Sequence, residues 1–349
     1  MTGRKKRITA AEIAKIAGVS RSTVTGVIND YPYIAEKTKK EVRDIIKAYG
    51  YVPNSAARVL VGMQPKIIGH FVYGQTGRMQ NSYIESLMVD VISSAQQNEY
   101  SVVTSIITED KADPVIKLLQ DGTIQGAIVT GGGHHESELK TLFDSKFPVV
   151  FVNKFPADFN LSQYRNKHIV KSDNIKGGYL ATEYLIKNGH TDIMHISGLH
   201  DRLSACDRLQ GYKQALIDYK IPVKEERIKE GNYTIERAEI IFEACITSGE
   251  PLPSAVFATN DMTAIGVMRA CRRHGIRIPD ELSIIGFDDL LLASEIQPAL
   301  TTMKAGSNSL AESAVNLLLE TLDKDEVSAQ VKILDPILIE RDSVRNILI

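Results

Sequence analysis

Residues 9–28 read Thr-Ala-Ala-Glu-Ile-Ala-Lys-Ile-Ala-Gly-Val-Ser-Arg-Ser-Thr-Val-Thr-Gly-Val-Ile, and this stretch decides how the first part of the chain folds. Thr9 followed three residues later by Glu12 fits a capping box, which predicts the start of a helix. Gly18 stands where the end of that helix needs a residue with positive φ, and Ser20 can cap a second helix. The stretch therefore predicts two short helices joined by a tight turn at a glycine.

The spacing of Ala14, Gly18 and Val24 is typical of a helix-turn-helix. Such a unit needs a small residue where the helices cross, a glycine in the turn and a branched apolar residue in the second helix. A third helix is predicted further on by apolar residues at helical spacing, which are Val42, Ile45, Ile46 and Tyr49. The same spacing also fits an αα-hairpin with no role in DNA binding, so the charge and the neighbouring motifs must decide between the two interpretations.

Charge is distributed unevenly along the 349 residues. The formal net charge is −2, yet residues 1–64 contain twelve Lys and Arg against five Asp and Glu, which favours a polyanion as the partner of this part. In a helix-turn-helix the N-terminal residues of the second helix enter the major groove, so Arg21 and Ser22 are candidates for reading bases. Arg21 can donate a bidentate pair to guanine or contact only a phosphate. Further candidates for phosphate contacts are Thr9, Ser20, Thr25 and the basic residues 4–7.

A short segment with its own helix signals follows the third helix. Pro53 ends the preceding structure, and Asn54 can cap a helix over residues 54–61. Isolated helices need about 12 or more residues in water, so this hinge helix is expected to fold only against something else. Leu60 would then be an exposed apolar residue that unstacks a base step in the minor groove, or else it would pack onto a neighbouring domain.

From Lys66 onward, apolar runs alternate with amphipathic segments, as in a parallel sheet covered by helices on both faces. Strands are predicted at 67–72, 101–107, 126–129, 148–152, 193–197, 255–258 and 283–286, and helices at 83–97, 114–119, 177–188, 209–219 and 262–274. The predicted fold class is an α N-terminal helix-turn-helix domain, residues 1–62, followed by an α/β domain with two lobes, residues 66–349.

Polar and aromatic side chains follow several predicted strands, at the sheet edge where α/β folds bind ligands. The candidate effector contacts are Tyr73, Tyr83, Asn153, Arg208, Asn260 and Asp288. Arginine, carboxamide and carboxylate groups suit bidentate recognition of vicinal hydroxyls, and tyrosine rings can cover the apolar side of a sugar in a chain without tryptophan. Arg208 is expected to open the helix after strand 193–197. Asn and Asp at strand ends are also common as caps or turn residues, and Asp261 and Asp289 are expected to be such structural residues.

Several motifs together resemble the lactose/galactose-repressor (LacI–GalR) family of bacterial transcription regulators. In the first part of the chain they are Ala17-Gly18-Val19-Ser20, Thr23-Val24, Val27-Ile28-Asn29, Tyr51-x-Pro53-Asn54 and Ala57-Arg58-x-Leu60. In the second part they include Ser172-Asp173-Asn174, Arg208-x-x-Gly211-Tyr212, Thr259-Asn260-Asp261, Gly286-Phe287-Asp288-Asp289 and Leu300-Thr301-Thr302. The resemblance therefore covers the whole chain.

The resemblance implies a homodimer that reads a near-palindromic operator and responds to a small molecule between its lobes. It also implies that residues 66–349 form an α/β two-lobed, periplasmic-binding-protein-like effector and dimerisation domain. The first lobe is expected to comprise about 66–171 and 303–333, and the second about 172–302 and 334–349. The hinge helices would pair in the minor groove with Leu60 as the intercalating residue, and Asn54 and Ala57 are further candidates for DNA contact. The positions that match the effector contacts of the family are Tyr73, Asn153, Arg208, Asn260 and Asp288. Gly26 stands where the family usually has a base-reading arginine, and Ala305 where some relatives have a polar ligand contact. Because no leucine heptad follows the last strand, a dimer without a coiled-coil tetramer is expected.

Two other classes of protein are considered. A sugar-processing α/β enzyme is the main alternative, but Gly131-Gly132-Gly133-His134-His135 lacks the full pattern of a phosphate loop, and adjacent histidines do not suit a metal site. A periplasmic sugar receptor needs a signal peptide, and the basic residues 4–7 are not followed by an apolar run.

The three cysteines form no CxxC pair, which favours a reducing compartment, and no apolar run reaches membrane length. The prediction is a cytoplasmic, dimeric DNA-binding transcriptional regulator that represses carbohydrate-utilisation genes and uses no cofactor, metal or catalytic residue. Its effector is expected to be a sugar or sugar derivative, although some relatives answer to a purine or a partner protein.

Overall fold

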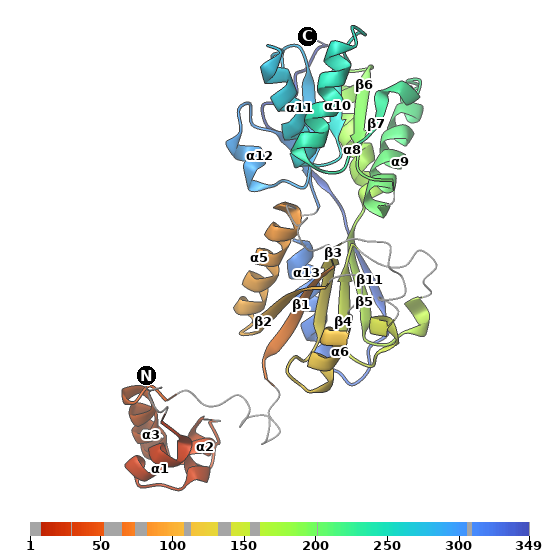
Figure 1. Ribbon diagram of the computed structural model, residues 1–349. Helices are drawn as coiled ribbons and strands as arrows, with labels where there is room; N and C mark the ends of the chain where they lie inside the picture. Colours follow the sequence, from red (N-terminus) through yellow and green to blue (C-terminus); the bar gives the residue numbers. More distant parts are fainter. Residues whose placement is uncertain are drawn as a thin grey trace. The chain divides into compact units, whose positions relative to one another are not determined.

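The computed structural model describes residues 8–28, 30–51, 65–73, 82–107, 113–131, 141–153, 161–200, 202–305 and 309–348. The chain divides into two compact units, a head, Met1–Pro65, and a body, Lys66–Ile349 (Figure 1). Among the described residues, no helix is both long enough and apolar enough to cross a membrane.

The described part of the head consists of the helices α1 (Ala10–Ala17), α2 (Arg21–Ile28) and α3 (Glu36–Ala48). The predicted capping box is present, because the Thr9 hydroxyl accepts the Glu12 backbone N–H and the Thr9 backbone N–H donates to the Glu12 carboxylate at 2.8 Å. Gly18 ends α1 with a φ of 64°, a left-handed conformation that glycine adopts without a steric penalty. The prediction of two short helices around a glycine turn is therefore confirmed.

All three helices contribute to the small hydrophobic core of the head. The buried cluster contains Ile13 and Ala14 from α1, Val24 and Val27 from α2, and Val42 from α3. Helices as short as α1 and α2 are marginal alone in water, so this shared core supplies most of their stability.

The body consists of two lobes, each built on one sheet. The first lobe contains β1 (Ile67–Tyr73), α5 (Ser82–Gln97), β2 (Ser101–Ile107), α6 (Asp113–Gln120), β3 (Ala127–Gly131), β4 (Val149–Val152), η1 (Leu161–Gln163), β5 (Lys167–Ser172), α13 (Leu310–Leu322) and β11 (Gln330–Leu334). The second lobe contains α8 (Asn174–Lys187), β6 (Ile193–Ser197), α9 (Leu203–Asp218), η2 (Glu225–Arg227), β7 (Ile228–Glu230), α10 (Ile235–Thr247), β8 (Ala255–Ala258), α11 (Asp261–Arg273), β9 (Ser283–Phe287), α12 (Leu291–Glu295), β10 (Thr301–Lys304) and β12 (Ile337–Ile339).

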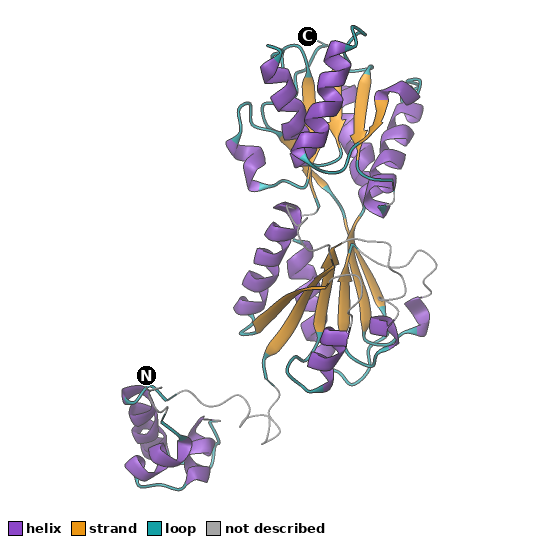
Figure 2. Ribbon diagram, in the orientation of Figure 1, coloured by secondary structure: helices purple, strands orange, loops and turns teal. Residues whose placement is uncertain are grey.

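Both sheets have six strands and are flanked by helices (Figure 2). The first sheet has the strand order β11-β5-β4-β3-β1-β2, and its neighbouring strands are parallel. The second has the order β12-β10-β9-β8-β6-β7, in which β12 runs antiparallel to β10 and the other pairs are parallel. The carboxyl ends of the parallel strands are where an α/β sheet binds ligands.

The described elements show three passages of the chain between the lobes, which lie between β5 and α8, between β10 and α13, and between β11 and β12. The sequence prediction put the second passage at about residue 303, inside β10. Met303 and Lys304 instead pair with Leu338 and Ile337 in the second sheet, so the chain leaves this lobe only after Lys304.

Each sheet separates two hydrophobic clusters. Ile68 lies in a cluster with residues of α5 and α13, whereas Phe71 of the same strand lies in the cluster on the opposite face. Val256 and Phe257 alternate in the same way in the second lobe. Central strands such as β1, β4 and β9 are buried on both faces, which explains why uninterrupted apolar runs predicted them.

Candidate functional sites

The first turn of α2 carries the candidates for reading bases. Arg21 and Ser22 are exposed there. The Ser20 Oγ accepts the Thr23 backbone N–H at 3.0 Å and thereby caps the helix. The Thr25 hydroxyl donates to the Arg21 carbonyl oxygen at 3.1 Å. The helix thus exposes the Arg21 and Ser22 side chains, and the hydroxyls of Ser20, Ser22 and Thr25 make local hydrogen bonds, with the Ser20 and Ser22 Oγ atoms 2.7 Å apart.

Several predicted DNA contacts fall outside the described residues. They are Asn54, Ala57, Leu60 and the basic residues 4–7. These contacts stay predictions, as do the phosphate contacts of Thr9, Ser20 and Thr25.

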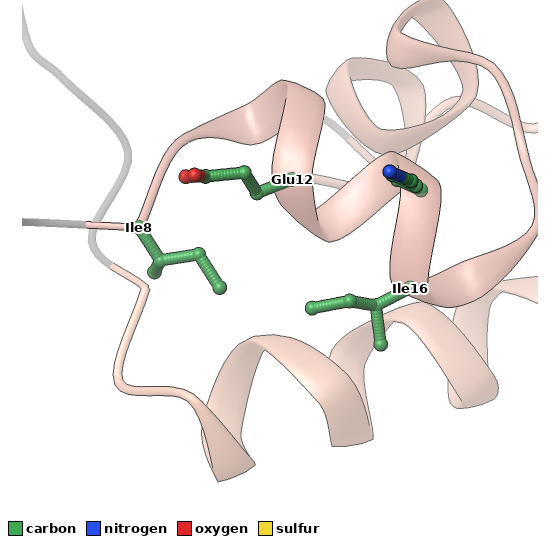
Figure 3. A pocket seen from close by; sticks show the side chains of 4 residues that line it. Ile8, Glu12 and Ile16 are labelled. Carbon is green, nitrogen blue, oxygen red and sulfur yellow. The ribbon is translucent and has the colours of Figure 1, made fainter.

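A hollow of about 370 Å³ lies beside α1 (Figure 3). Its lining residues are Ile8, Glu12, Lys15 and Ile16. None of them is a predicted site residue, so the hollow adds nothing to the candidates on α2.

Arg208 is at the centre of the candidate effector site in the body. Only 7% of its surface is exposed. The prediction that it opens its helix is wrong, because α9 begins five residues earlier, at Leu203. The Arg208 Nε donates to Asn174 Oδ1 at 2.9 Å, and its Nη1 donates to the Thr259 carbonyl oxygen at 2.5 Å. Its Cζ lies 3.6 Å from the centre of the Phe287 ring, so three segments of the second lobe fix the guanidinium.

Asp288 faces Arg208 from the carboxyl end of β9. The Arg208 Nη2 and the Asp288 Oδ1 lie 3.6 Å apart, and the Asp288 side chain is only 7% exposed. Burial raises the pKa of Asp288 to about 6, although the charge of Arg208 opposes the rise. Asp288 also has a φ of 112°, a conformation that is costly for a residue other than glycine and that clusters at functional sites. The pair places a planar donor beside two acceptor oxygens.

Two residues of the first lobe belong to the same site. The Asn153 Nδ2 donates to the Tyr83 Oη at 2.9 Å, and the Asn153 Oδ1 accepts the Ser172 backbone N–H at 3.0 Å. Burial, and then the negative charge of Asp288, raise the pKa of Tyr83. Tyr83 is therefore within electrostatic reach of a carboxylate in the other lobe. The structure thus brings together four of the six predicted contacts, namely Tyr83, Asn153, Arg208 and Asp288.

The other two predicted contacts have structural roles. The Asn260 Oδ1 accepts the Thr263 backbone N–H at 2.9 Å and so caps α11, which is the alternative that the sequence left open. The Asn260 Nδ2 lies 3.4 Å from the Tyr233 carbonyl oxygen. Tyr73, the last residue of β1, is buried in the same hydrophobic cluster as Phe71.

Three residues that were not predicted as contacts also lie in this site. Asn174 and Phe287 hold Arg208, and both stand in motifs that were noted only for the family resemblance. Tyr233 packs on Gly198, and its hydroxyl lies 3.4 Å from the Ser204 Oγ. Burial raises the pKa of Tyr233, and the positive charge of Arg208 opposes this rise. No sequence signal pointed to Tyr233, because its neighbours are distant in the chain.

Asp261 and Asp289 are structural, as predicted. The Asp261 Oδ2 accepts the Leu290 backbone N–H at 2.8 Å, and its Oδ1 accepts the Thr302 hydroxyl at 2.5 Å. The Asp289 Oδ1 lies 2.6 Å from the Arg341 Nη2. Among the described residues, no group of three His, Cys, Asp or Glu could hold a metal ion.

The head and the body together define a class of protein. A helix-turn-helix that exposes the first turn of its second helix is a DNA reader, and a two-lobed α/β unit with polar groups from both lobes is a small-molecule receptor. A chain that combines them is a transcription regulator controlled by a ligand.

Comparisons with known proteins identify the family. Residues 9–54 match the bacterial regulatory proteins of the lacI family, and residues 182–344 match the periplasmic binding protein-like domain. The HTH-type transcriptional repressor PurR of Vibrio parahaemolyticus is 33% identical over 344 residues, which cover 97% of this chain and 99% of that protein. The probable HTH-type transcriptional repressor ExuR of Bacillus subtilis is 30% identical over 340 residues, with 97% and 99% covered. The chain therefore belongs to the lacI family and is a DNA-binding transcriptional repressor.

Solved structures agree with the fold. A lac repressor dimer bound to operator and the anti-inducer ONPF has a TM-score of 0.79 at 24% identity, with 97% of this chain and 100% of that chain covered. The complex of the transcriptional regulator CelR with cellobiose has a TM-score of 0.70 at 24% identity, with the same coverage. The predicted fold class and family are thus confirmed, and because the relatives are repressors, the enzyme alternative is set aside.

Proposed function

We propose that a sugar or sugar derivative controls this repressor by binding between the two lobes of the body, and that the repressor regulates carbohydrate-utilisation genes. The observation that carries the proposal is the buried pair of Arg208 and Asp288. Its planar donor and its carboxylate oxygens match two neighbouring hydroxyls of a sugar. The half-buried ring of Tyr83 supplies the aromatic surface that the apolar side of a sugar needs.

The proposed control works through the relative orientation of the lobes. Tyr83 and Asn153 come from the first lobe, and Arg208 and Asp288 from the second. A ligand that contacts both lobes binds one orientation better than another, and it shifts the equilibrium by that difference in affinity. On the DNA side, the repressor acts as a homodimer in the cytoplasm, with Arg21 and Ser22 at the base edges of an operator.

The test is a thermal-shift screen of the full chain against monosaccharides, disaccharides, sugar phosphates and purine bases. A sugar present at 100 times its Kd is expected to stabilise the folded protein by about 2.7 kcal/mol. Purine bases are the second candidate, because the half-buried rings of Tyr83 and Tyr233 offer flat aromatic faces. A response to purines with none to sugars would overturn the sugar proposal in favour of this second candidate.

A further inference from the structure

Gly26 is buried even though α2 turns this position away from the core of the head. The core residues of α2 are Val24 and Val27. At 3.6 residues per turn, Gly26 lies about 200° around the helix from Val24 and one turn after the exposed Ser22. The residues that cover Gly26 must therefore come from the edge of the core or from outside it.

The loop between α2 and α3 provides this cover. A Cβ built on Gly26 would lie 2.5 Å from the Ile34 Cδ1 and 3.3 Å from the Tyr31 Cδ2. The Tyr31 backbone N–H donates to the Gly26 carbonyl oxygen at 2.9 Å, which fastens the loop to the last turn of α2. Ile34 therefore occupies most of the space that a side chain at position 26 would use, and the Tyr31 ring borders that space.

Ion pairs hold this loop in place. Asp30, which has a left-handed φ of 52°, lies 2.9 Å from the Nζ of the buried Lys39 and 2.7 Å from the Arg43 Nη2. The rings of Tyr31 and Tyr33 are 5.4 Å apart, at an interplanar angle of 38°. The Tyr31 ring is thus positioned before any partner binds, which lowers the entropy lost on binding.

We propose that Tyr31 reads a base edge in the major groove next to Ser22 and Arg21. Tyr31 remains 39% exposed, so its hydroxyl can donate to or accept from a base edge, and its ring can contact a thymine methyl group. A residue of the loop after α2 thereby contacts the base pair that a longer side chain at position 26 would contact. This inference rests on the proposed contact of Arg21 and Ser22 with the groove.

The experiment selects binding sites for the full-length protein from a random duplex library. Tyr31→Ala is expected to lower the preference at one or two base pairs by about 5- to 100-fold and to leave the other positions and the salt dependence unchanged. Tyr49→Ala is the matched control, because Tyr49 is 55% exposed at the end of α3, and the profile is expected to stay as in the wild type.

Tyr31→Leu keeps an apolar side chain over Gly26 and is judged by the same criterion if Tyr31→Ala does not fold. A folded variant with an unchanged profile, or with the same loss on every duplex, would overturn the proposal. If Arg21→Ala changes the profile while the Tyr31 variant does not, base reading by α2 stands and only the role of Tyr31 fails.

A gain of function tests the position directly. The triple variant Gly26→Arg with Tyr31→Ala and Ile34→Val removes the Tyr31 ring and the Ile34 Cδ1 and supplies a bidentate donor. It is expected to prefer guanine at the base pair that Tyr31→Ala alone no longer reads. A new preference at any other base pair would contradict the inference that Tyr31 and a side chain at position 26 reach the same base pair.

Discussion

Arg208 is packed inside the second lobe and is also the residue that the proposed function assigns to ligand binding. It is buried, and its Nε and Nη1 donate to Asn174 and to the Thr259 carbonyl oxygen. A buried acceptor that loses its donor costs about 1–3 kcal/mol. Removal of Arg208 therefore affects stability as well as binding, and a test of its role has to separate the two.

Arg208→Ala is expected to abolish the thermal shift that the screened sugar gives, because the guanidinium that donates to two sugar hydroxyls is lost. The affinity for operator DNA is expected to stay within about threefold of the wild type. Arg208→Lys keeps the charge beside Asp288 but not the fork, so it is expected to retain the fold and still lose most of the response. Arg277→Ala, at an exposed arginine of the same lobe, serves as the control. An unchanged dose curve in Arg208→Ala would remove Arg208 from the site.

At the residue scale, the sequence predicted the residues of the candidate effector site unevenly. Asn153, Arg208 and Asp288 could be found because each follows a strand end or stands in a distinctive motif. Asn260 also follows a strand, but its oxygen caps a helix, and the two roles give the same local sequence. Tyr233 could not be found, because its place depends on packing against the distant Gly198.

At the scale of the helix, the role of Asn260 can be resolved by two variants. Asn260→Ala is expected to lower the free energy of unfolding by about 1 kcal/mol, because α11 loses its cap, and Asn260→Ser is expected to restore most of it. Urea unfolding measures both effects. Equal stability of the Ala and Ser variants would contradict the capping role. A sugar response that is lost in the stable Ser variant would show that the Asn260 amide also binds ligand.

A continuous apolar run is what makes a strand visible in the sequence. Central strands such as β1 and β9 could be predicted because both of their faces are buried by apolar residues. The central strands β5 and β10 were not predicted, because Lys167, His168, Thr301 and Thr302 interrupt their apolar runs although these side chains are buried. The strand β11 was not singled out, because it lies at a sheet edge and four of its five residues are exposed. β7 and β12 have only three residues each, too few to show a pattern.

For the whole molecule, three fully buried histidines predict a loss of stability in acid. Burial lowers the pKa of His70 and of His168 to about 4, and that of His195 to about 3. An unfolded histidine has a pKa of about 6.5, so below this pH the unfolded chain binds protons that the folded chain does not. The free energy of unfolding therefore falls as the pH drops from about 6.5 toward 4. Asp288, with a pKa raised to about 6, acts in the opposite sense, so a matched variant is needed.

His70→Gln isolates one of these histidines. Glutamine can keep a hydrogen bond to the Thr130 Oγ1, which the His70 Nε2 reaches at 2.9 Å. The slope of the free energy of unfolding against pH is expected to fall by up to about 1.4 kcal/mol per pH unit between pH 6 and 4.5. Urea titrations at several pH values measure this slope, with His274→Gln as the control at an exposed histidine. A slope equal to that of the wild type would exclude His70 as a source of acid sensitivity.

The central claim is that one chain joins a DNA-reading head to a sugar-sensing body. The most direct measurement is the affinity of the full-length protein for its selected operator and for a scrambled duplex, over a range of salt, with and without the screened sugar. We expect the operator to bind at least about 10³-fold more tightly, log K to fall linearly with log salt, and the sugar to change operator affinity. Equal affinity for both duplexes at every salt concentration, unaffected by the sugar, would contradict the account.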